Sequence, residues 1–433
     1  MPSVDVPVAL LGYGTVGAAV HRLLEEQGGE IERATGHRLR VVRALVRDPG
    51  KERGFEAAPG VLTDDPADVL GDASLALVAE VMGGVEPAGS YVLDLLGSGR
   101  SVVTANKQLV ARRGAELFAA AASSGAQLRF EASVCAAIPV IKVLREALVV
   151  SNVHRVLGIV NGTTNFILTE MEGGATFGEA LAEAQRLGYA EADPTDDVSG
   201  ADAAAKMAIL ATVAFGSRVT LADVDYQGVE EVTPLHVAAA RELEMVVRLV
   251  GSATLVDERL DVRVRPAFVD RHHPLAAVEG AFNAVMLQGD AIREITLEGP
   301  GAGGIETASA VVADMVNAFG TQGLLQNDAC WRELEALPPG ALRSPFYVHL
   351  EVDDRPGVLA DVARRLAEHD VSVARLVQMP APVGAVLHIV VHEAAESAVE
   401  SALSEISDLQ IVHAPPFLVP VVSDRGVAEL GWA

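Results

Sequence analysis

A glycine-rich turn near the start of the chain constrains its fold more than any other feature. The turn reads Gly12-Tyr13-Gly14-Thr15-Val16-Gly17, and it lies between the apolar run 4–11 and an amphipathic stretch that ends near Glu26. Glycines here permit a tight turn and let the backbone approach a pyrophosphate, which rests on the N-terminus of the following helix. A lone pattern of this kind is weak evidence, but its place between a predicted strand and a predicted helix strengthens it. We therefore predict that Gly12, Gly14, Thr15, Val16 and Gly17 bind a dinucleotide.

Short apolar runs and helical segments alternate through the first third of the chain. Predicted strands cover 39–46, 76–81, 101–104 and 127–132, and predicted helices cover 89–96 and 111–122. Strands that alternate with helices form parallel, doubly wound sheets. We therefore predict the α/β class, with a Rossmann-type parallel sheet domain over 1–132 that is completed by about 305–335.

The rest of the chain predicts two further domains, which suits a length of 433 residues. Over 133–304 the pattern changes to mixed helices and antiparallel strands, an α+β domain with the richest polar clusters. The segment 336–345 contains proline and glycine and is typical of a linker. A small α+β unit is predicted over 346–433.

Charge and composition exclude several functions. The formal net charge of −26 argues against nucleic acid and anionic membranes as partners, because both bind basic faces. No apolar run is long and charge-free enough to span a bilayer, and we expect no secretory signal. The two cysteines, Cys135 and Cys330, are far apart and do not form a disulfide framework or metal cluster. We expect a soluble, cytoplasmic protein.

Lysine is rare in this chain, with four copies among 33 basic Lys and Arg residues. Two of the four, Lys107 and Lys206, lie inside short polar segments. Arginine stays charged at any working pH, whereas the pKa of a lysine shifts with burial and neighbouring charges. Lys107 and Lys206 are therefore candidate proton carriers, although codon bias that spared four lysines by chance is the alternative.

Acidic residues gather just before Lys206. They are Glu191, Asp196, Asp197 and Asp202. If the chain is helical from Ser199 onwards, Asp202 and Lys206 are four residues apart and share one face. Such carboxylates suit a substrate with an ammonium group, and the alternative is a solvated acidic loop with a capping aspartate.

The end of the second predicted strand bears on the choice of dinucleotide. An acidic residue at this corner binds the ribose hydroxyl of NAD, whereas a cationic residue accommodates the 2′-phosphate of NADP. Arg47 and Lys51 favour NADP, and Asp48 keeps NAD open.

Five segments together closely resemble the homoserine dehydrogenase family, which interconverts L-homoserine and L-aspartate 4-semialdehyde. They are 79–111 (AEVMGGVEPA and VVTANKQLVA), 130–146 (FEASVCAAIPVIKVLRE), 158–172 (GIVNGTTNFILTEME), 188–206 (GYAEADPTDDVSGADAAAK) and 299–316 (GPGAGGIETASAVVADMV). The resemblance runs over residues 6–320 in the same order. It implies a substrate-binding, catalytic and dimerisation domain at 133–304, in a homodimer or homotetramer.

The resemblance also implies roles for individual residues. Lys107 would lie between cofactor and substrate as the acid/base, and Lys206 would orient the reacting oxygen beside Asp202. The sequence does not decide which lysine carries the proton. Substrate binding falls to Glu191, Asp197, Asp202 and Lys206, and cofactor binding, beyond the glycine turn, to Arg47, Lys51, Thr104, Lys107 and Gly303.

A structural sodium ion is a further implication of the resemblance, held by main-chain carbonyls of Glu131, Val134 and Ala136. The family usually has glycines where this chain has Ala136 and Ala137, so any positive φ there would be strained. Cys135 in the same loop is interpreted as a small core residue.

The segment 347–378 resembles the first half of an ACT domain, a βαββαβ module that binds amino acids at subunit interfaces. Its turn Asp354-Arg355-Pro356-Gly357 would hold a ligand carboxylate. Feedback inhibition by L-threonine is the hypothesis, and a dimerisation element without a ligand is the alternative.

Two other functions compete with homoserine dehydrogenase. One is a related NAD(P)-dependent amino-acid oxidoreductase, and the other is a catalytically silent amino-acid sensor on the same fold. Retention of Lys107 and Lys206 in a chain with few lysines favours an enzyme.

Overall fold

The computed structural model describes residues 4–320 and 335–422, which fold into two compact units. The described parts of unit 1 come from 1–156, 203–224 and 282–334. Those of unit 2 come from 157–202, 225–281 and 335–433. Among the described residues, no helix combines the length and the apolar character needed to cross a membrane.

Unit 1 contains a six-stranded sheet in the order β3-β2-β1-β4-β5-β6, and all its strand pairs are parallel. Its strands are β1 (Val4–Leu11), β2 (His37–Leu45), β3 (Leu62–Thr63), β4 (Leu77–Glu80), β5 (Ser101–Thr104) and β6 (Leu128–Arg129). The order reverses between β1 and β4, which leaves a crevice at the carboxyl ends of these two strands. The predicted doubly wound parallel sheet is confirmed.

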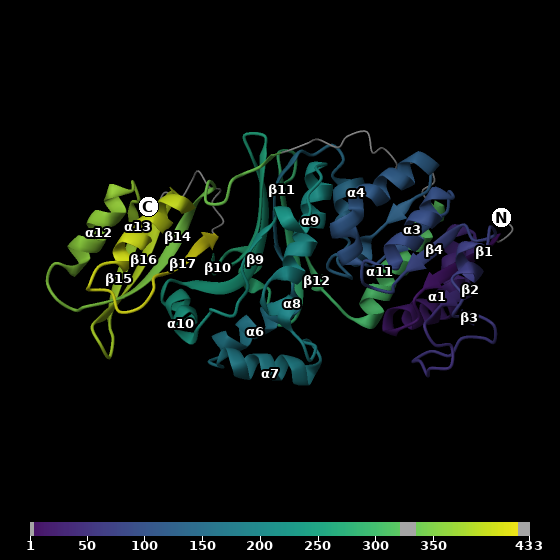
Figure 1. Ribbon diagram of the computed structural model, residues 1–433, viewed down its shortest axis with the longest axis horizontal. Coiled ribbons are helices and arrows are strands. Elements are labelled where there is room, and N and C mark those ends of the chain that lie inside the picture. Colours follow the sequence, from purple (N-terminus) through teal and green to yellow (C-terminus); the bar gives the residue numbers. More distant parts are fainter. Residues whose placement is uncertain (1–3, 321–334, 423–433) are drawn as a thin grey trace. The chain divides into compact units, whose positions relative to one another are not determined.

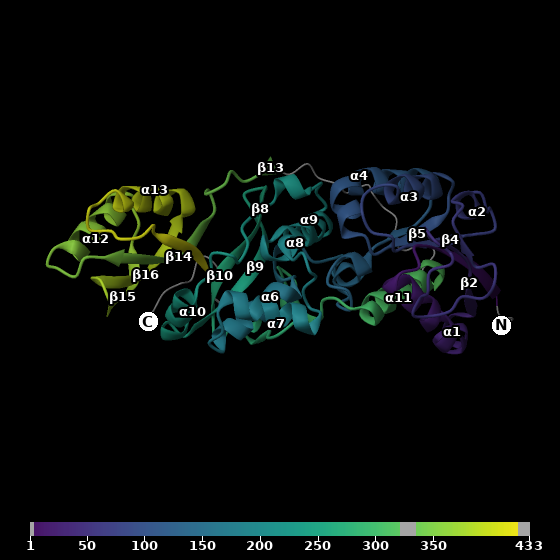
Figure 2. The ribbon, with the colours of Figure 1, turned by 60° about the horizontal axis from the view of Figure 1, so that its bottom comes forward.

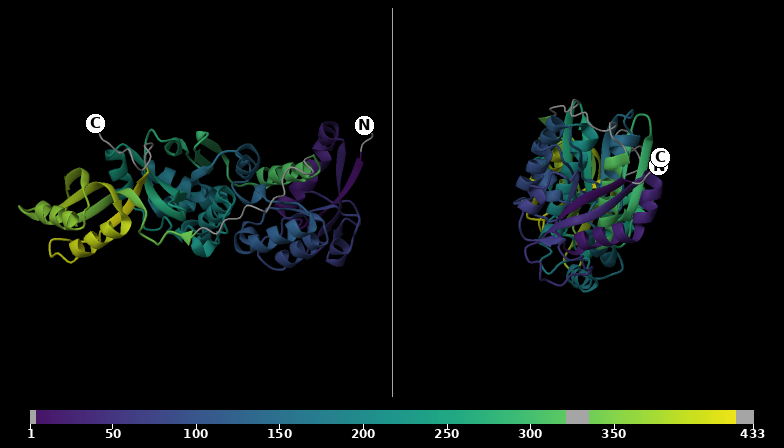
Figure 3. Two further views of the ribbon diagram at one scale, coloured as in Figure 1. Left: turned by 90° about the horizontal axis from the view of Figure 1, so that it is seen from above. Right: turned by 90° about the vertical axis from the view of Figure 1, so that its right-hand side faces the viewer.

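Helices cover both faces of this sheet (Figure 2). They are α1 (Thr15–Thr35), α2 (Ala67–Leu70), α3 (Ala88–Gly97), α4 (Lys107–Ser124) and α11 (Gly304–Gly320). Helices α1 and α11 pack together on one face, and α3 and α4 pack together on the other. Figure 3 shows α11, from late in the chain, beside the N-terminal α1. Because both faces are covered, β4 is buried along its whole length and its sequence shows no alternation of apolar and polar residues.

The remainder of unit 1 lies outside the parallel sheet. It includes η1 (Glu131–Ser133), α5 (Val140–Lys142), η2 (Val143–Ala147), η3 (Leu221–Asp223) and the antiparallel hairpin of β11 (Phe282–Gly289) and β12 (Arg293–Pro300). Strand β7 (Val153–Ile159) and helix α9 (Ala201–Phe215) each belong partly to both units.

Unit 2 contains a long antiparallel pair, β9 (Met245–Val256) and β10 (Arg259–Asp270). Around the pair are α6 (Gly162–Glu172), α7 (Phe177–Leu187), α8 (Thr195–Val198), β8 (Asp225–Tyr226), α10 (Pro234–Glu242), η4 (Pro274–Ala277) and β13 (Glu335–Ala336).

The C-terminal part of unit 2 has the predicted βαββαβ order (Figure 1). Its elements are β14 (Arg343–Val352), α12 (Val358–Glu368), β15 (Val373–Pro380), β16 (Ala385–Ala395), α13 (Glu396–Ser407) and β17 (Phe417–Val422). The strands pair antiparallel in the order β17-β14-β16-β15, and both helices lie on one face of the sheet (Figure 2). The interior is aliphatic, with Val348, Leu350 and Ile389 fully buried.

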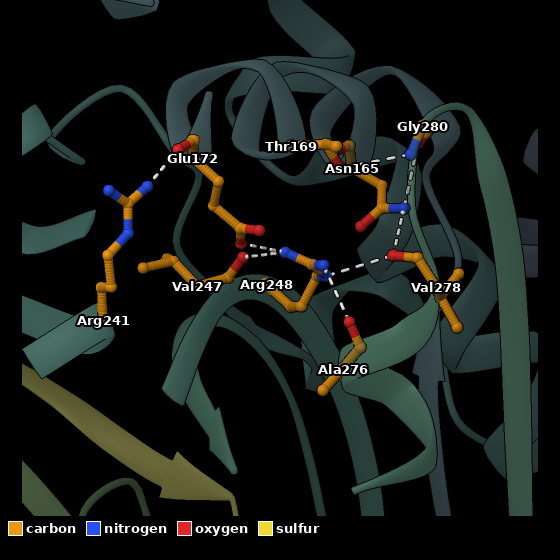
Figure 4. Close-up of polar contacts among 9 residues, drawn as sticks. All are labelled: Asn165, Thr169, Glu172, Arg241, Val247, Arg248, Ala276, Val278 and Gly280. Atoms are coloured by element: carbon orange, nitrogen blue, oxygen red, sulfur yellow. Dashed lines mark hydrogen bonds and ion pairs between the residues drawn. The ribbon is translucent and has the colours of Figure 1, made fainter. Parts of the chain in front are cut away.

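A buried arginine anchors the C-terminal end of α6 (Figure 4). Arg248 on β9 is fully buried, and its guanidinium donates to the carboxylate of Glu172, the last residue of α6. The same group donates to the carbonyl oxygens of Val247 (2.9 Å), Ala276 (2.9 Å) and Val278 (3.2 Å). One cation therefore joins β9, α6 and the segment that follows η4.

The middle of α6 holds the same segment through neutral hydrogen bonds (Figure 4). The Asn165 side-chain amide donates to the carbonyl oxygens of Val278 (3.1 Å) and Gly280 (3.0 Å). The Gly280 amide in turn donates to the Thr169 hydroxyl at 3.2 Å. These bonds fix the position of α6, whose first turn carries part of the site described below.

Arg248→Met should lower the free energy of unfolding by about 3 kcal/mol, because the Glu172 carboxylate and three carbonyl groups lose their charged donor. The matched control is Arg241→Met, since Arg241 is exposed and donates to the Glu172 carbonyl oxygen. Its replacement should change the free energy by less than about 1 kcal/mol. Urea unfolding measures both, and equal losses would contradict the anchoring role of Arg248.

Candidate active site

The glycine turn has the geometry that a dinucleotide requires. Gly12 follows β1 with a φ of +106°, and a Cβ there would lie 2.8 Å from the Val81 carbonyl oxygen. A Cβ on Gly17 would lie 2.3 Å from the Gly12 carbonyl oxygen, so neither glycine can be replaced without a shift of the backbone. At Gly14, by contrast, no described atom lies within 4 Å of the Cβ position, so the backbone can be approached closely there. Within the described residues, no side chain caps the first turn of α1, which leaves its amides suited to an anion.

A cavity of about 1160 Å³ opens beside this turn. It is lined by the turn itself, by the segment after β2, by residues 81–83 after β4, and by Gly304 and Ile305. Both Arg47 and Lys51 line this cavity. The cavity lies at the carboxyl edge of the sheet, where such sheets bind their ligands.

Arg53, close behind Lys51 in the sequence, shapes the wall of this cavity. Its guanidinium donates to the carbonyl oxygens of Tyr13 (3.1 Å), Asp48 (2.6 Å) and Lys51 (2.5 Å). The Asp48 carboxylate accepts from the Gly50 amide at 2.8 Å, so it closes a local turn. Arg53 and Asp48 thus organise the segment that presents Arg47 and Lys51.

A second cavity in unit 1, of about 310 Å³, brings Lys107 and Lys206 together. Lys107 is the first residue of α4, and Lys206 on α9 is buried. Gly83 lines both this cavity and the larger one, so the two adjoin. A dinucleotide cavity that adjoins a pair of lysines suits hydride transfer coupled to proton transfer.

Two residues predicted to bind the cofactor, Thr104 and Gly303, are not among those that line the cavity beside the glycine turn. Thr104 is fully buried at the end of β5, and its hydroxyl donates to the Glu80 carboxylate at 2.6 Å. Gly303 has a φ of +139° and precedes α11, next to Gly304 in the wall of the larger cavity. Sequence reasoning missed Glu80, because a carboxylate at the end of an apolar strand carries no pattern of its own.

The predicted acidic residues Asp197 and Asp202 meet in unit 2 at the start of α6. Asn161 is the N-cap of this helix, and its side-chain oxygen accepts from the Thr164 amide at 2.8 Å. Its side-chain NH₂ donates to Asp197 at 2.7 Å and to Asp202 at 2.8 Å. Glu191 is exposed, and its carbonyl oxygen accepts from the Gln185 side chain. One amide group therefore holds two carboxylates side by side.

Helix α9 carries one of the acidic residues, Asp202, and one of the two lysines, Lys206. Asp202 lies in its first turn and Lys206 one turn later, so the two side chains share a helical face, as the sequence predicts. Asp202 is buried, and a carboxylate near a helix N-terminus is stabilised by the helix dipole.

The loop predicted to hold sodium begins at Glu131. The Glu131 carboxylate accepts from the Ile141 (2.8 Å) and Lys142 (2.7 Å) amides, and its own amide donates to Asp314 at 2.9 Å. Burial and the nearby Asp314 carboxylate raise the pKa of Glu131 to about 7. Burial raises the pKa of Asp314 to about 6.

The backbone of this loop is left-handed at two residues with side chains. Cys135 has a φ of +54° and Ala136 a φ of +36°, so the strain expected at Ala136 is present and extends to Cys135. In the described part of the chain, no cluster of three or more His, Cys, Asp or Glu side chains could hold a metal ion. A main-chain sodium site at Glu131, Val134 and Ala136 stays a prediction.

The dinucleotide turn and the adjoining lysine cavity define a nicotinamide-dependent oxidoreductase. Residues 12–131 match the NAD-binding domain of homoserine dehydrogenase, 139–316 match homoserine dehydrogenase, and 347–410 match the ACT domain. Homoserine dehydrogenase of Mycobacterium tuberculosis is 41% identical over 95% of this chain and 97% of that protein. The Bacillus subtilis enzyme is 37% identical over 99% of both chains. The chain therefore belongs to the homoserine dehydrogenase family, as the sequence predicts.

Solved structures agree with this family. A homoserine dehydrogenase from Thiobacillus denitrificans matches with a TM-score of 0.92 and 38% identity, over 98% of this chain and 99% of that one. A hyperthermophilic archaeal homoserine dehydrogenase in complex with NADPH matches with a TM-score of 0.63 and 30% identity, over 75% of this chain and all of that one. The predicted enzyme class and ACT domain are confirmed.

Proposed function

We propose that the chain oxidises L-homoserine to L-aspartate 4-semialdehyde reversibly with NADP, with Lys107 as the acid/base and Lys206 orienting the reacting oxygen. One observation carries the proposal: Lys107 and Lys206 line a single cavity that adjoins the dinucleotide cavity through Gly83.

Oxidation of homoserine removes a hydroxyl proton and a hydride from the same end of the molecule. A bound nicotinamide supplies the hydride acceptor. The proton needs a group of the protein that can accept and return it, and a lysine side chain that lines the cavity suits that task. We assign it to Lys107, and the buried Lys206 ammonium donates to the substrate oxygen and holds its position. In the reverse direction Lys107 returns the proton.

Carboxylates provide the counter-charge for the substrate ammonium group. Asp197 and Asp202 are held close together by the Asn161 amide, and neither carboxylate is neutralised by that bond. A cation between two such groups gains charge-assisted hydrogen bonds to both. Glu191 extends the acidic surface, as the resemblance implies.

The preference for NADP rests on the segment after β2. Arg47 and Lys51 line the cavity beside Asp48, and one oxygen of the Asp48 carboxylate is engaged by the Gly50 amide. The NADPH bound to the archaeal relative is consistent with this preference.

Two further ligands are proposed. L-Threonine would bind at the turn before α12, where Gly357 has a φ of +99° and exposes backbone amides to a carboxylate. The ACT unit and the middle domain would join copies of the chain into a homodimer or homotetramer, which sedimentation velocity tests. Sodium would bind to the carbonyl oxygens of Glu131, Val134 and Ala136 as a structural ion, and no step of the reaction depends on it.

Lys107→Ala and Lys206→Ala should each lower kcat for homoserine oxidation by about 100- to 10,000-fold, because a positioned proton carrier contributes that much. Lys142→Ala is the matched control, since the Lys142 side chain is 46% exposed and lies outside both cavities. If the limb of the pH–rate profile that reports the acid/base persisted in Lys107→Ala and vanished in Lys206→Ala, the two roles would be exchanged. Wild-type rates in both variants would refute the proposal, and no turnover in the wild type would indicate a silent sensor.

Arg47→Ala should lower the ratio of kcat/KM with NADP to kcat/KM with NAD by about tenfold, the value of one charge-assisted hydrogen bond to a phosphate. Arg40→Ala is the control, because Arg40 lies on β2, the strand that precedes Arg47, is exposed and pairs with Asp5. An unchanged ratio in Arg47→Ala would remove the structural reason for an NADP preference.

L-Threonine and sodium should each raise the unfolding temperature by about 3 °C when saturating, because both bind the native state. D-Threonine and choline chloride at equal concentrations are the controls. Threonine should also slow homoserine oxidation. If it changed neither temperature nor rate, the ACT unit would be a dimerisation element alone. If sodium acted no differently from choline, the cation site would be absent.

A further inference from the structure

Glu80 ends β4 in unit 1, and its carboxylate is fully buried where the two cavities adjoin. One oxygen accepts from the Thr104 hydroxyl at 2.6 Å. The other accepts from the amides of Met82 (2.8 Å) and Gly83 (3.3 Å) and from the Asn106 side chain at 3.5 Å. A buried carboxylate with four donors holds in place the segments after β4 and β5 that supply these donors.

Burial and hydrogen bonding act on the pKa of Glu80 in opposite directions. Burial raises the pKa of Glu80, and the hydrogen bonds from Thr104, Met82, Gly83 and Asn106 oppose that effect. Amide groups can only donate, and the Thr104 hydroxyl accepts from the Asn106 amide at 3.0 Å while it donates to Glu80. Each of the four contacts points a donor at a carboxylate oxygen of Glu80, so each of them favours the ionised form.

From Glu80 a chain of contacts leads to the proposed proton carrier. The Asn106 side-chain NH₂ donates to Glu80 and to the Gly84 carbonyl oxygen, the latter at 2.5 Å. The side-chain oxygen of Asn106 accepts from the Leu109 amide at 3.1 Å, which caps α4. Lys107 is the first residue of that helix. The orientation of Asn106 therefore sets where α4, and with it the Lys107 backbone, begins.

The Glu80 carboxylate also holds part of the wall of the dinucleotide cavity. Met82 and Gly83, whose amides bond to Glu80, both line the dinucleotide cavity. Gly83 and Gly84 each have a φ of +75°, which glycine adopts without strain, and the Glu80 carboxylate fixes the loop through its bonds to the Met82 and Gly83 amides. One side chain thus fixes the loop beside the dinucleotide and the start of the helix that carries Lys107.

We propose that Glu80 is a positioning residue that sets the Lys107 amine at its working distance from the bound dinucleotide. The proposal rests on the role of Lys107 given above. A misplacement of about 1 Å at a reacting group costs about 100-fold in rate, so a residue that ties both walls together should affect the chemical step. A purely structural role would instead affect folding or ligand binding.

Glu80→Gln tests the proposal, because glutamine keeps the shape and removes the charge. Its amide oxygen can still accept from Met82 and Gly83, but its NH₂ faces the Thr104 hydroxyl and reverses that bond. We expect kcat for homoserine oxidation to fall by about 10- to 100-fold, with KM for homoserine and NADP changed by less than about threefold. Glu179→Gln is the control, since Glu179 also accepts from a threonine hydroxyl (2.7 Å) and an amide (2.9 Å), at the exposed start of α7.

Combination with Lys107→Ala separates a positioning role from an independent one. If Glu80 acts through Lys107, the double variant should be as slow as Lys107→Ala alone, within about threefold. Independent effects would multiply and overturn the proposal. So would a Glu80→Gln variant that raised KM for NADP while kcat stayed at the wild-type value. Thr104→Val, which removes the same hydrogen bond from the other side, should reproduce the fall in kcat if Glu80→Gln does not fold.

The two proposals fail in different ways. A slow Lys107→Ala with a wild-type Glu80→Gln would overturn the role of Glu80 and leave that of Lys107 intact. A wild-type Lys107→Ala would overturn the role of Lys107, and a slow Glu80→Gln in that case would show that Glu80 acts on another group.

Discussion

The reversal of strand order between β1 and β4 is the constraint on which the rest of unit 1 depends. Connections from the two strands leave toward opposite faces of the sheet, so their carboxyl ends open a crevice. Gly12 follows β1, Glu80 ends β4 and Thr104 ends β5. These three positions meet at one edge because parallel strands end together there, although up to 92 residues separate them in the chain. The dinucleotide turn and the start of α4 are thereby built on the same rigid edge.

In unit 2 the positions of the acidic residues are fixed by a helix and not by the edge of a parallel sheet. Asp197 and Asp202 are bound through Asn161 to the start of α6. This helix is held at both ends, because Asn161 caps its start and Arg248 binds Glu172 at its end. A helix fixed at both ends presents its first turn in one orientation, so Asp197 and Asp202 stay together despite their like charge. The Asn161 amide offsets part of that repulsion, because its two N–H groups point at the two carboxylates.

Local patterns in the sequence predict the turn, the parallel sheet and the shared face of Asp202 and Lys206, and the resemblance to the ACT domain implies the βαββαβ unit. All of these depend on spacing along the chain, which the sequence displays directly. Contacts between distant segments carry no such signal. Thr104 is predicted at the cofactor, yet the structure turns its hydroxyl toward Glu80, 24 residues earlier. Arg53 is consistent with phosphate binding in the sequence, but its guanidinium is used by the backbone of its own loop. Side-chain direction at the end of a strand is set by partners that only the fold brings together.

The loop between Glu131 and Ala136, beside the lysine cavity, has two unfavourable features. They are buried carboxyl groups with raised pKa values and a left-handed backbone at Cys135 and Ala136. Folded-state pKa values of about 7 for Glu131 and about 6 for Asp314 lie above their ordinary values. The native state therefore binds their protons more tightly, and the stability that these groups contribute at low pH is lost as the pH rises through 6 and 7. In the same loop Cys135 and Ala136 have positive φ, which costs about 1–2 kcal/mol for each residue that has a side chain. Such conformations persist only where the surroundings determine them, and they gather at functional sites. A cation bound to this loop would offset the negative charge of the Glu131 and Asp314 carboxylates at neutral pH. This reason for the proposed sodium ion holds although alanines replace the family's glycines at positions 136 and 137.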